Sequence, residues 1–114
     1  MEIDDYQKAV AALEEPYPHD LGFMYNCFAN GCSTGVLSNK VKDILMRPSG
    51  EFTETDKEDF LYILGDMLHR VSALANSCGL SLNDIAATNI SVLKTEAVKR
   101  GAMAENGIFR KPQK

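Results

Sequence analysis

The sequence lacks the features that mark membrane-spanning, secreted and disulfide-bonded proteins. It has no apolar run near the roughly 20 residues that a membrane-crossing helix needs, and it opens with the acidic segment 1–5 instead of a basic secretion signal. Its three cysteines, Cys27, Cys32 and Cys78, are odd in number and form no Cys-x-x-Cys pair, which argues against a disulfide framework and a zinc site. We therefore expect a cytoplasmic chain with reduced thiols and no membrane partner.

The negative charge of the chain is unevenly distributed. The net charge is −4, yet the last sixteen residues carry five basic side chains and one acidic side chain, so residues 1–98 hold all of the excess negative charge. Such an acidic body binds phosphate backbones poorly, which argues against DNA or RNA as a partner. A chain of 114 residues can bury one core. We expect a single domain over residues 1–101 and a basic, flexible tail over residues 102–114.

The first half of the chain has the periodicity of two helices. A first helix is indicated by apolar residues at spacings of three and four, namely Ile3, Tyr6, Val10 and Leu13. Two prolines in the segment 15–20 forbid a regular helix there and predict a loop. A second helix is expected to begin near Leu21, to be interrupted or loosened around residues 30–35, and to resume as far as Leu45.

The second half of the chain predicts two more helices. Thr55 and Glu58 have the spacing of a capping box, and the apolar series that follows ends at Gly79. Ser81 begins a fourth helix, which offers apolar residues for packing before Gly101, namely Ile85, Ile90, Leu93 and Val98. No stretch alternates like a strand. The sequence thus predicts an all-α fold, an antiparallel four-helix bundle, whose broad apolar third helix favours completion by homo-oligomerisation.

Several motifs in this order resemble those of one enzyme family. They are Asp5-Tyr6-Gln7, a Tyr-Pro loop, Lys40-Val41-Lys42-Asp43-Ile44-Leu45, the long helix containing Leu64-Gly65-Asp66, the Gly79-Leu80-Ser81-Leu82 turn and Asn89. This pattern, over roughly residues 5 to 101, resembles the MazG-like nucleoside triphosphate pyrophosphohydrolases. The resemblance implies a four-helix all-α fold and a Mg²⁺-dependent reaction that yields a nucleoside monophosphate and pyrophosphate.

The resemblance also shows which metal ligands are missing. The positions of the family's two helix-two glutamates fall on Ser33 and Val36, and that of the helix-three glutamate falls on Ile63. Asp66 is retained, and Asp59, seven residues earlier, could offer a second oxygen donor. Residues 21–42 contain no Asp or Glu, so no shift of register restores the set. Asp66 and Asp59 are therefore expected to be relic ligands of a degenerate site that binds Mg²⁺ weakly.

Four polar residues are candidates for contact with a nucleotide. The resemblance places Lys40 and Lys42 near a phosphate and Asn89 near a base or sugar, and Lys94 is a weaker case of the same kind. Each has an ordinary structural explanation, because lysines on exposed helices mainly increase solubility. Asp66 can likewise form a helical ion pair with Arg70. The acidic first turn of the third helix can simply complement the helix dipole.

Three functions remain open at this point. The first is a MazG-like module without catalysis that binds a nucleotide or regulates a protein partner. The second is a Mg²⁺-dependent pyrophosphohydrolase with a rearranged site built from Asp59, Asp66 and first-turn acids. The third is a purely structural interaction protein whose pocket is filled by apolar side chains.

Overall fold

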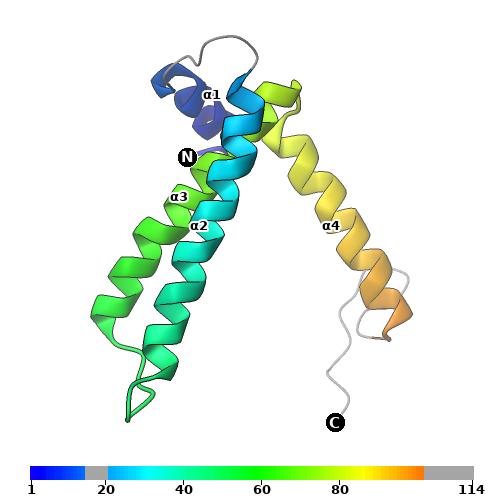
Figure 1. Cartoon of the computed structure of the whole chain (residues 1–114). Helices are drawn as coiled ribbons and strands as arrows, with labels where there is room; N and C mark the ends of the chain where they lie inside the picture. Colours follow the sequence, from blue (N-terminus) through cyan, green and yellow to red (C-terminus); the bar gives the residue numbers. More distant parts are fainter. Residues whose placement is uncertain (15–20, 102–114) are drawn as a thin grey trace.

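The computed structural model describes residues 1–14 and 21–101, and these form four α-helices. The helices are α1 (Ile3–Leu13), α2 (Leu21–Leu45), α3 (Glu54–Cys78) and α4 (Leu82–Lys99) (Figure 1). Within these two ranges there is no strand, which confirms the predicted all-α class and the number of helices. The predicted loop at residues 15–20 and the predicted tail at residues 102–114 lie outside the described residues.

The helix α2 runs without a break, so the predicted interruption at residues 30–35 is wrong. Gly31 and Gly35 lie inside the helix and face open space. A helical glycine costs about 1 kcal/mol relative to alanine, and packing against α3 offsets this cost because Ala29 and Ser33 are buried in the same turns. Tertiary contact therefore overrides the local preference of the glycine-containing segment.

The helix α3 begins two residues earlier than the motif Thr55–Glu58 suggested. Its capping box is formed by Thr53 and Asp56, whose side chains bond to each other's backbone N–H. The predicted capping box at Thr55 and Glu58 is therefore wrong. At the other end the prediction is confirmed, since Gly79 takes the left-handed conformation with φ 70° that glycine adopts without strain.

The helices α2 and α3 form an antiparallel hairpin. Their facing side chains recur at alternating spacings of three and four, which is the pattern of packed helical pairs. The buried or half-buried positions in this pattern are Ser33, Leu37, Lys40 and Ile44 on α2, Arg47 just after α2, and Asp56, Phe60, Ile63, Met67, Arg70 and Leu74 on α3. The seam is therefore charged at the end near the α2–α3 loop, and apolar side chains such as Leu37 and Ile63 lie between that end and Ser33.

The helix α1 crosses the opposite end of this hairpin and holds the start of α4 (Figure 1). Of the predicted apolar face of α1 only Val10 is fully buried, whereas Leu13 and Ile3 are exposed. Ser81 caps α4 as predicted, accepting a hydrogen bond from the N–H of Asp84.

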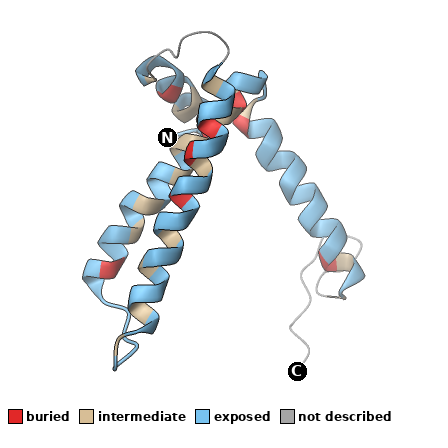
Figure 2. Ribbon diagram, in the orientation of Figure 1, coloured by how far each residue is buried: buried red, intermediate tan, exposed pale blue. Residues whose placement is uncertain are grey.

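The helix α4 diverges from the hairpin, so the predicted four-helix bundle is not closed within one chain (Figure 1). Most of α4 is exposed, apart from residues near its two ends (Figure 2). The radius of gyration is 18.0 Å, compared with about 13 Å for a compact domain of about 100 residues. No helix in the described ranges has the length and apolar character required to cross a membrane.

Candidate functional site

A cluster of charges closes the hairpin near the α2–α3 loop. Asp56, which is buried, accepts hydrogen bonds from Arg47 Nη1 and Nη2 at 2.5 and 2.8 Å and from Lys40 Nζ at 2.8 Å. Thr53 donates to the same carboxylate from its N–H and its hydroxyl. Lys40 Nζ also binds Asp59 at 2.7 Å. These five residues are called the Asp56 cluster below.

Every cation in the Asp56 cluster is bound by a carboxylate, and these bonds shift the pKa values of both partners. Hydrogen bonds from Arg47, then from Lys40 and from the Thr53 N–H, hold the pKa of Asp56 far below its usual range. Hydrogen bonds from Asp56 and Asp59 raise the pKa of Lys40, and Asp56 does the same for Arg47. Asp56 therefore stays ionised at any ordinary pH.

A second polar contact lies midway along the hairpin. The Ser33 hydroxyl donates to Asp66 Oδ2 at 2.5 Å, and Arg70 Nε lies 3.9 Å from Asp66 Oδ1. The predicted helical pair between Asp66 and Arg70 is therefore present at the outer limit of an ion pair. The Arg70 guanidinium also lies over the ring of Tyr25, 5.9 Å from its centroid.

Two shallow cavities follow one another along this side of the hairpin, here called the groove. One, of about 250 Å³, is lined by residues that include Ser33, Val36 and Asp66. The other, of about 360 Å³, is lined by residues that include Val36, Ile63, Asp59 and Lys40. The structure thus gathers Ser33, Val36, Ile63 and Asp66, the four positions at which the MazG resemblance expects metal ligands.

The chemistry of these four positions does not suit Mg²⁺, which requires several hard oxygen ligands. Val36 and Ile63 offer no lone pair, and Ser33 already uses its hydroxyl to bind Asp66. Asp59 is neutralised by Lys40. The described part of the chain contains no group of three or more His, Cys, Asp or Glu side chains arranged to hold a metal ion.

The residues predicted to contact a nucleotide do not come together in this chain. Lys40 lies in the groove, but its ammonium group is occupied by Asp56 and Asp59. Lys42 lies beside the apolar cavity that contains Val41 and Leu45. Asn89 and Lys94 are exposed on α4, which points away from the hairpin (Figure 1). The three cysteines are exposed, unpaired thiols.

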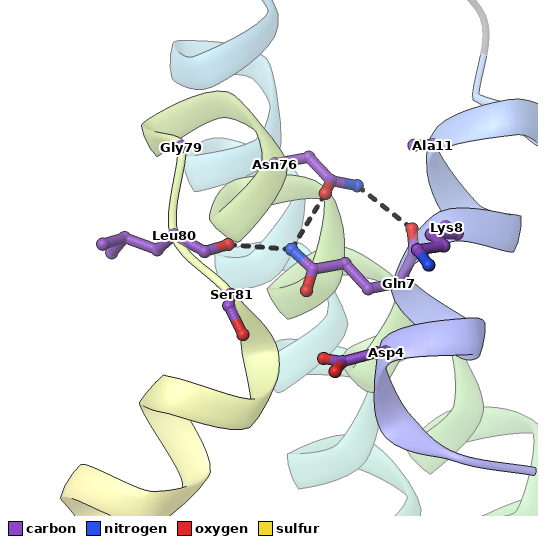
Figure 3. Close-up of a pocket in the computed structure, with 8 residues that line it drawn as sticks. All are labelled: Asp4, Gln7, Lys8, Ala11, Asn76, Gly79, Leu80 and Ser81. Carbon is purple, nitrogen blue, oxygen red and sulfur yellow. Dashed lines mark hydrogen bonds between the residues drawn. The ribbon is translucent and has the colours of Figure 1, made fainter.

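Sequence reasoning missed a polar junction that fixes α1 to the α3–α4 corner (Figure 3). The Gln7 amide donates to Asn76 Oδ1 at 2.9 Å and to the Leu80 carbonyl at 2.8 Å, and its oxygen accepts from the Leu82 N–H at 2.7 Å. Gln7 therefore satisfies an N–H in the first turn of α4. Only the motif Asp5-Tyr6-Gln7 pointed to this residue, and it did not indicate the role.

The side of α3 that receives α1 is the groove side. Burial, and then the negative charge of Asp66, raise the pKa of Tyr6 on α1. A further cavity of about 460 Å³ lies at the junction, lined by Gln7, Lys8 and Asn76 among others (Figure 3). Among its polar groups, the side chains of Gln7 and Asn76 hold the helices together.

Comparison with known proteins yields limited similarity. The chain matches no family model, and no solved structure is significantly similar. It is similar to the Gene 37 protein of Mycobacterium phage L5, with 32% identity over 73 residues, which are 64% of this chain. The match spans 63% of the length of that phage protein.

Proposed function

We propose that this chain is a MazG-like helical module that has lost metal-dependent catalysis and acts by binding protein partners. The observation that carries the proposal is the state of the carboxylates in the groove. Asp59 is bound by Lys40, and Asp66 is bound by Ser33 with Arg70 close by. The carboxylates that a metal ion would need are thus already bound by cations and a hydroxyl of the chain itself.

The exposed apolar surface favours protein binding over nucleotide binding. Large apolar side chains on α2, α3 and α4 are exposed in the described chain.

A small domain that keeps its helices while its ligand positions change retains what association requires. The printed name of the relative, Gene 37 protein, specifies no activity. We therefore propose a regulatory partner protein, with a homo-oligomer as the assembled state.

Pyrophosphate release is the direct test of this proposal. The unmodified protein is incubated with Mg²⁺ and a panel of nucleoside triphosphates, and binding of Mg²⁺ and of each nucleotide is titrated in parallel. We expect no Mg²⁺-dependent turnover above the buffer control. Robust hydrolysis that is abolished by Asp66→Ala or Asp59→Ala would instead establish the alternative, a pyrophosphohydrolase with a rearranged site.

Restoring the ligands sharpens the test. The triple variant Ser33→Glu, Val36→Glu and Ile63→Glu should bind Mg²⁺ more tightly than the unmodified protein, because the three carboxylates would join Asp66. Without metal it should melt at a lower temperature, since like charges then face one another. The matched control carries glutamine at the same three positions. Equal Mg²⁺ affinity in both variants would contradict the assignment of these positions.

A further inference from the structure

The helix α1 is attached to the rest of the described chain mainly by polar contacts. The residues on its docking side are Tyr6, Gln7, Val10 and Glu14, and of these only Val10 is fully buried. At the end of α1 the carboxylate of Glu14 accepts a hydrogen bond from Asn26 Nδ2 of α2 at 3.1 Å. Segments with few buried apolar contacts open locally before the whole domain unfolds. We therefore expect α1 to detach from the hairpin more easily than α2 detaches from α3.

Gln7 joins three parts of the chain through a single side-chain amide (Figure 3). Its Nε2 donates to Asn76 Oδ1 at 2.9 Å and to the Leu80 carbonyl at 2.8 Å, and its Oε1 accepts from the Leu82 N–H at 2.7 Å. Both amide hydrogens and the amide oxygen are thus used. They connect α1 to the end of α3, to the α3–α4 link and to the first turn of α4. An ionised glutamate has the same shape but offers no donor, so it cannot make these bonds.

The direction of α4 depends on this junction. Leu82 in its first turn is buried, whereas residues 83–96 are exposed (Figure 2). Among the described helices, α4 packs chiefly against α1 and diverges from the hairpin (Figure 1). Within the described ranges, α1 and the short link of residues 79–81 therefore hold α4 at its angle to the hairpin.

The contact of α1 with α2 is incompletely satisfied. Asn26 has an exposed fraction of 1%, and within residues 1–14 and 21–101 its Oδ1 has no hydrogen-bond partner. An unsatisfied buried acceptor destabilises the state that buries it. Because Glu14 binds the same amide, detachment of α1 lets water reach this oxygen, which offsets part of the hydrogen bonding lost on opening.

We propose that α1 is a strap with Gln7 as its clasp, and that opening of this strap frees α4 to change its direction relative to the α2–α3 hairpin. The strap and the first turn of α4 open together, because one amide joins them. The helix α4 exposes Ile85, Ile90 and Leu93, so the strap decides where this apolar arm lies and which surface the chain presents. None of the bonds of the clasp involves a carboxylate of the groove, so the opening does not depend on whether the groove retains catalysis.

Hydrogen exchange of the unmodified protein tests the strap. The Leu82 N–H is a direct probe, because the Gln7 side chain is its hydrogen-bond acceptor. The amides of α1 and of Leu82 should exchange with one common opening rate, about tenfold or more above that of the buried part of α3. Exchange of α1 only at the rate of global unfolding, or exchange of Leu82 that is independent of α1, would overturn the proposal.

Distances between two spin labels test the consequence for α4. In a background where the three cysteines are replaced by serine, labels are attached at Tyr62→Cys on α3 and Asn89→Cys on α4, both exposed positions. The labelled chain is diluted with unlabelled chain, so that only distances within one copy are measured. With the clasp intact, one narrow distance distribution is expected. Gln7→Glu should broaden it and speed the exchange of α1 about tenfold, because both donors of the clasp are lost.

The matched control is Lys8→Ala, which changes an exposed residue of the same cavity and shifts the net charge by the same amount as Gln7→Glu. It should leave the distances and the exchange of α1 unchanged. An unchanged distribution in Gln7→Glu, or an equal change in Lys8→Ala, would overturn the proposal. A broad distribution in the chain with an intact clasp would do the same, since α4 would then have no fixed direction. If Gln7→Glu does not fold, the exchange pattern of the unmodified protein decides.

Discussion

Two aspartates of α3 occupy neighbouring parts of one hairpin and are treated differently by the fold. Asp56 has an exposed fraction of 1% and accepts hydrogen bonds from Arg47, Lys40 and Thr53. Asp66 has an exposed fraction of 48%, with one hydrogen bond from Ser33 and a distant Arg70. The carboxylate of Asp56, at one end of the hairpin, is therefore saturated with hydrogen bonds from the chain, whereas that of Asp66, midway along it, is not.

The difference separates a structural carboxylate from one that folding does not require. Asp56 caps α3 and also joins it to α2, so its charge is used by both helices. Asp66 faces the groove, where water can hydrate it, and contributes to neither helix end. A residue kept from an ancestral metal site, as proposed above, would have these properties.

The largest effect is expected from Asp56→Asn, which keeps the shape of the side chain but removes its charge. Arg47 would lose both of its charge-assisted bonds, and the N-terminal cap of α3 would weaken. We expect the melting temperature to fall by about 5–10 °C. The control is Asp59→Asn, because Asp59 shares Lys40 but is half-exposed, and it should shift the melting temperature by less than about 2 °C. Equal shifts would show that Asp56 is not the centre of the cluster.

The pH dependence of stability gives a second, smaller effect. The folded-state pKa of Asp56 is lowered, so the folded chain binds fewer protons there than the unfolded chain. Its stabilisation is complete well above the ordinary pKa of 3.8 and is lost as pH falls through and below that value. Lys40 and Arg47 have raised pKa values, so their contributions are lost only in strongly alkaline solution. Melting curves between pH 3 and 7 should fall less steeply for Asp56→Asn than for the unmodified protein, and parallel curves would contradict this.

The sequence predicted the helices better than their arrangement. Periodicity located all four helices, and Gly79 and Ser81 are at the predicted places, whereas α3 is capped by Thr53 and not by Thr55. The predicted break at residues 30–35 was wrong. Burial of Ala29 and Ser33 of α2 against α3 outweighs the low helix propensity of Gly31 and Gly35. Nor could local pattern show how α4 is placed, since its first turn is bound by Gln7, which is distant in sequence.

The candidate site was predicted in its positions but not in its bonds. The alignment placed Ser33, Val36, Ile63 and Asp66 together, and the groove contains all four. The ion pairs of Lys40 could not be predicted, because its partners Asp56 and Asp59 come from another helix. The acidic first turn that contains Asp56 had been interpreted as a complement to the helix dipole or as part of a rearranged metal site. Its bonds to Arg47 and Lys40 depend on how the hairpin closes, which no spacing within α3 specifies.

The smallest effect is expected from Ser33→Ala, which removes the one hydrogen bond to Asp66. The serine is buried, but Asp66 is half-exposed and can bind water in place of the lost donor. A net loss of about 1 kcal/mol in the free energy of unfolding is therefore expected. The control is Thr34→Ala, which removes an exposed hydroxyl that bonds only to the Asn30 carbonyl of its own helix, and which should change stability by less than about 0.5 kcal/mol. Urea titrations of the two variants measure this difference. A loss from Ser33→Ala as large as that from Asp56→Asn would mean that Asp66 also holds the hairpin together, and its interpretation as a relic ligand would then be withdrawn.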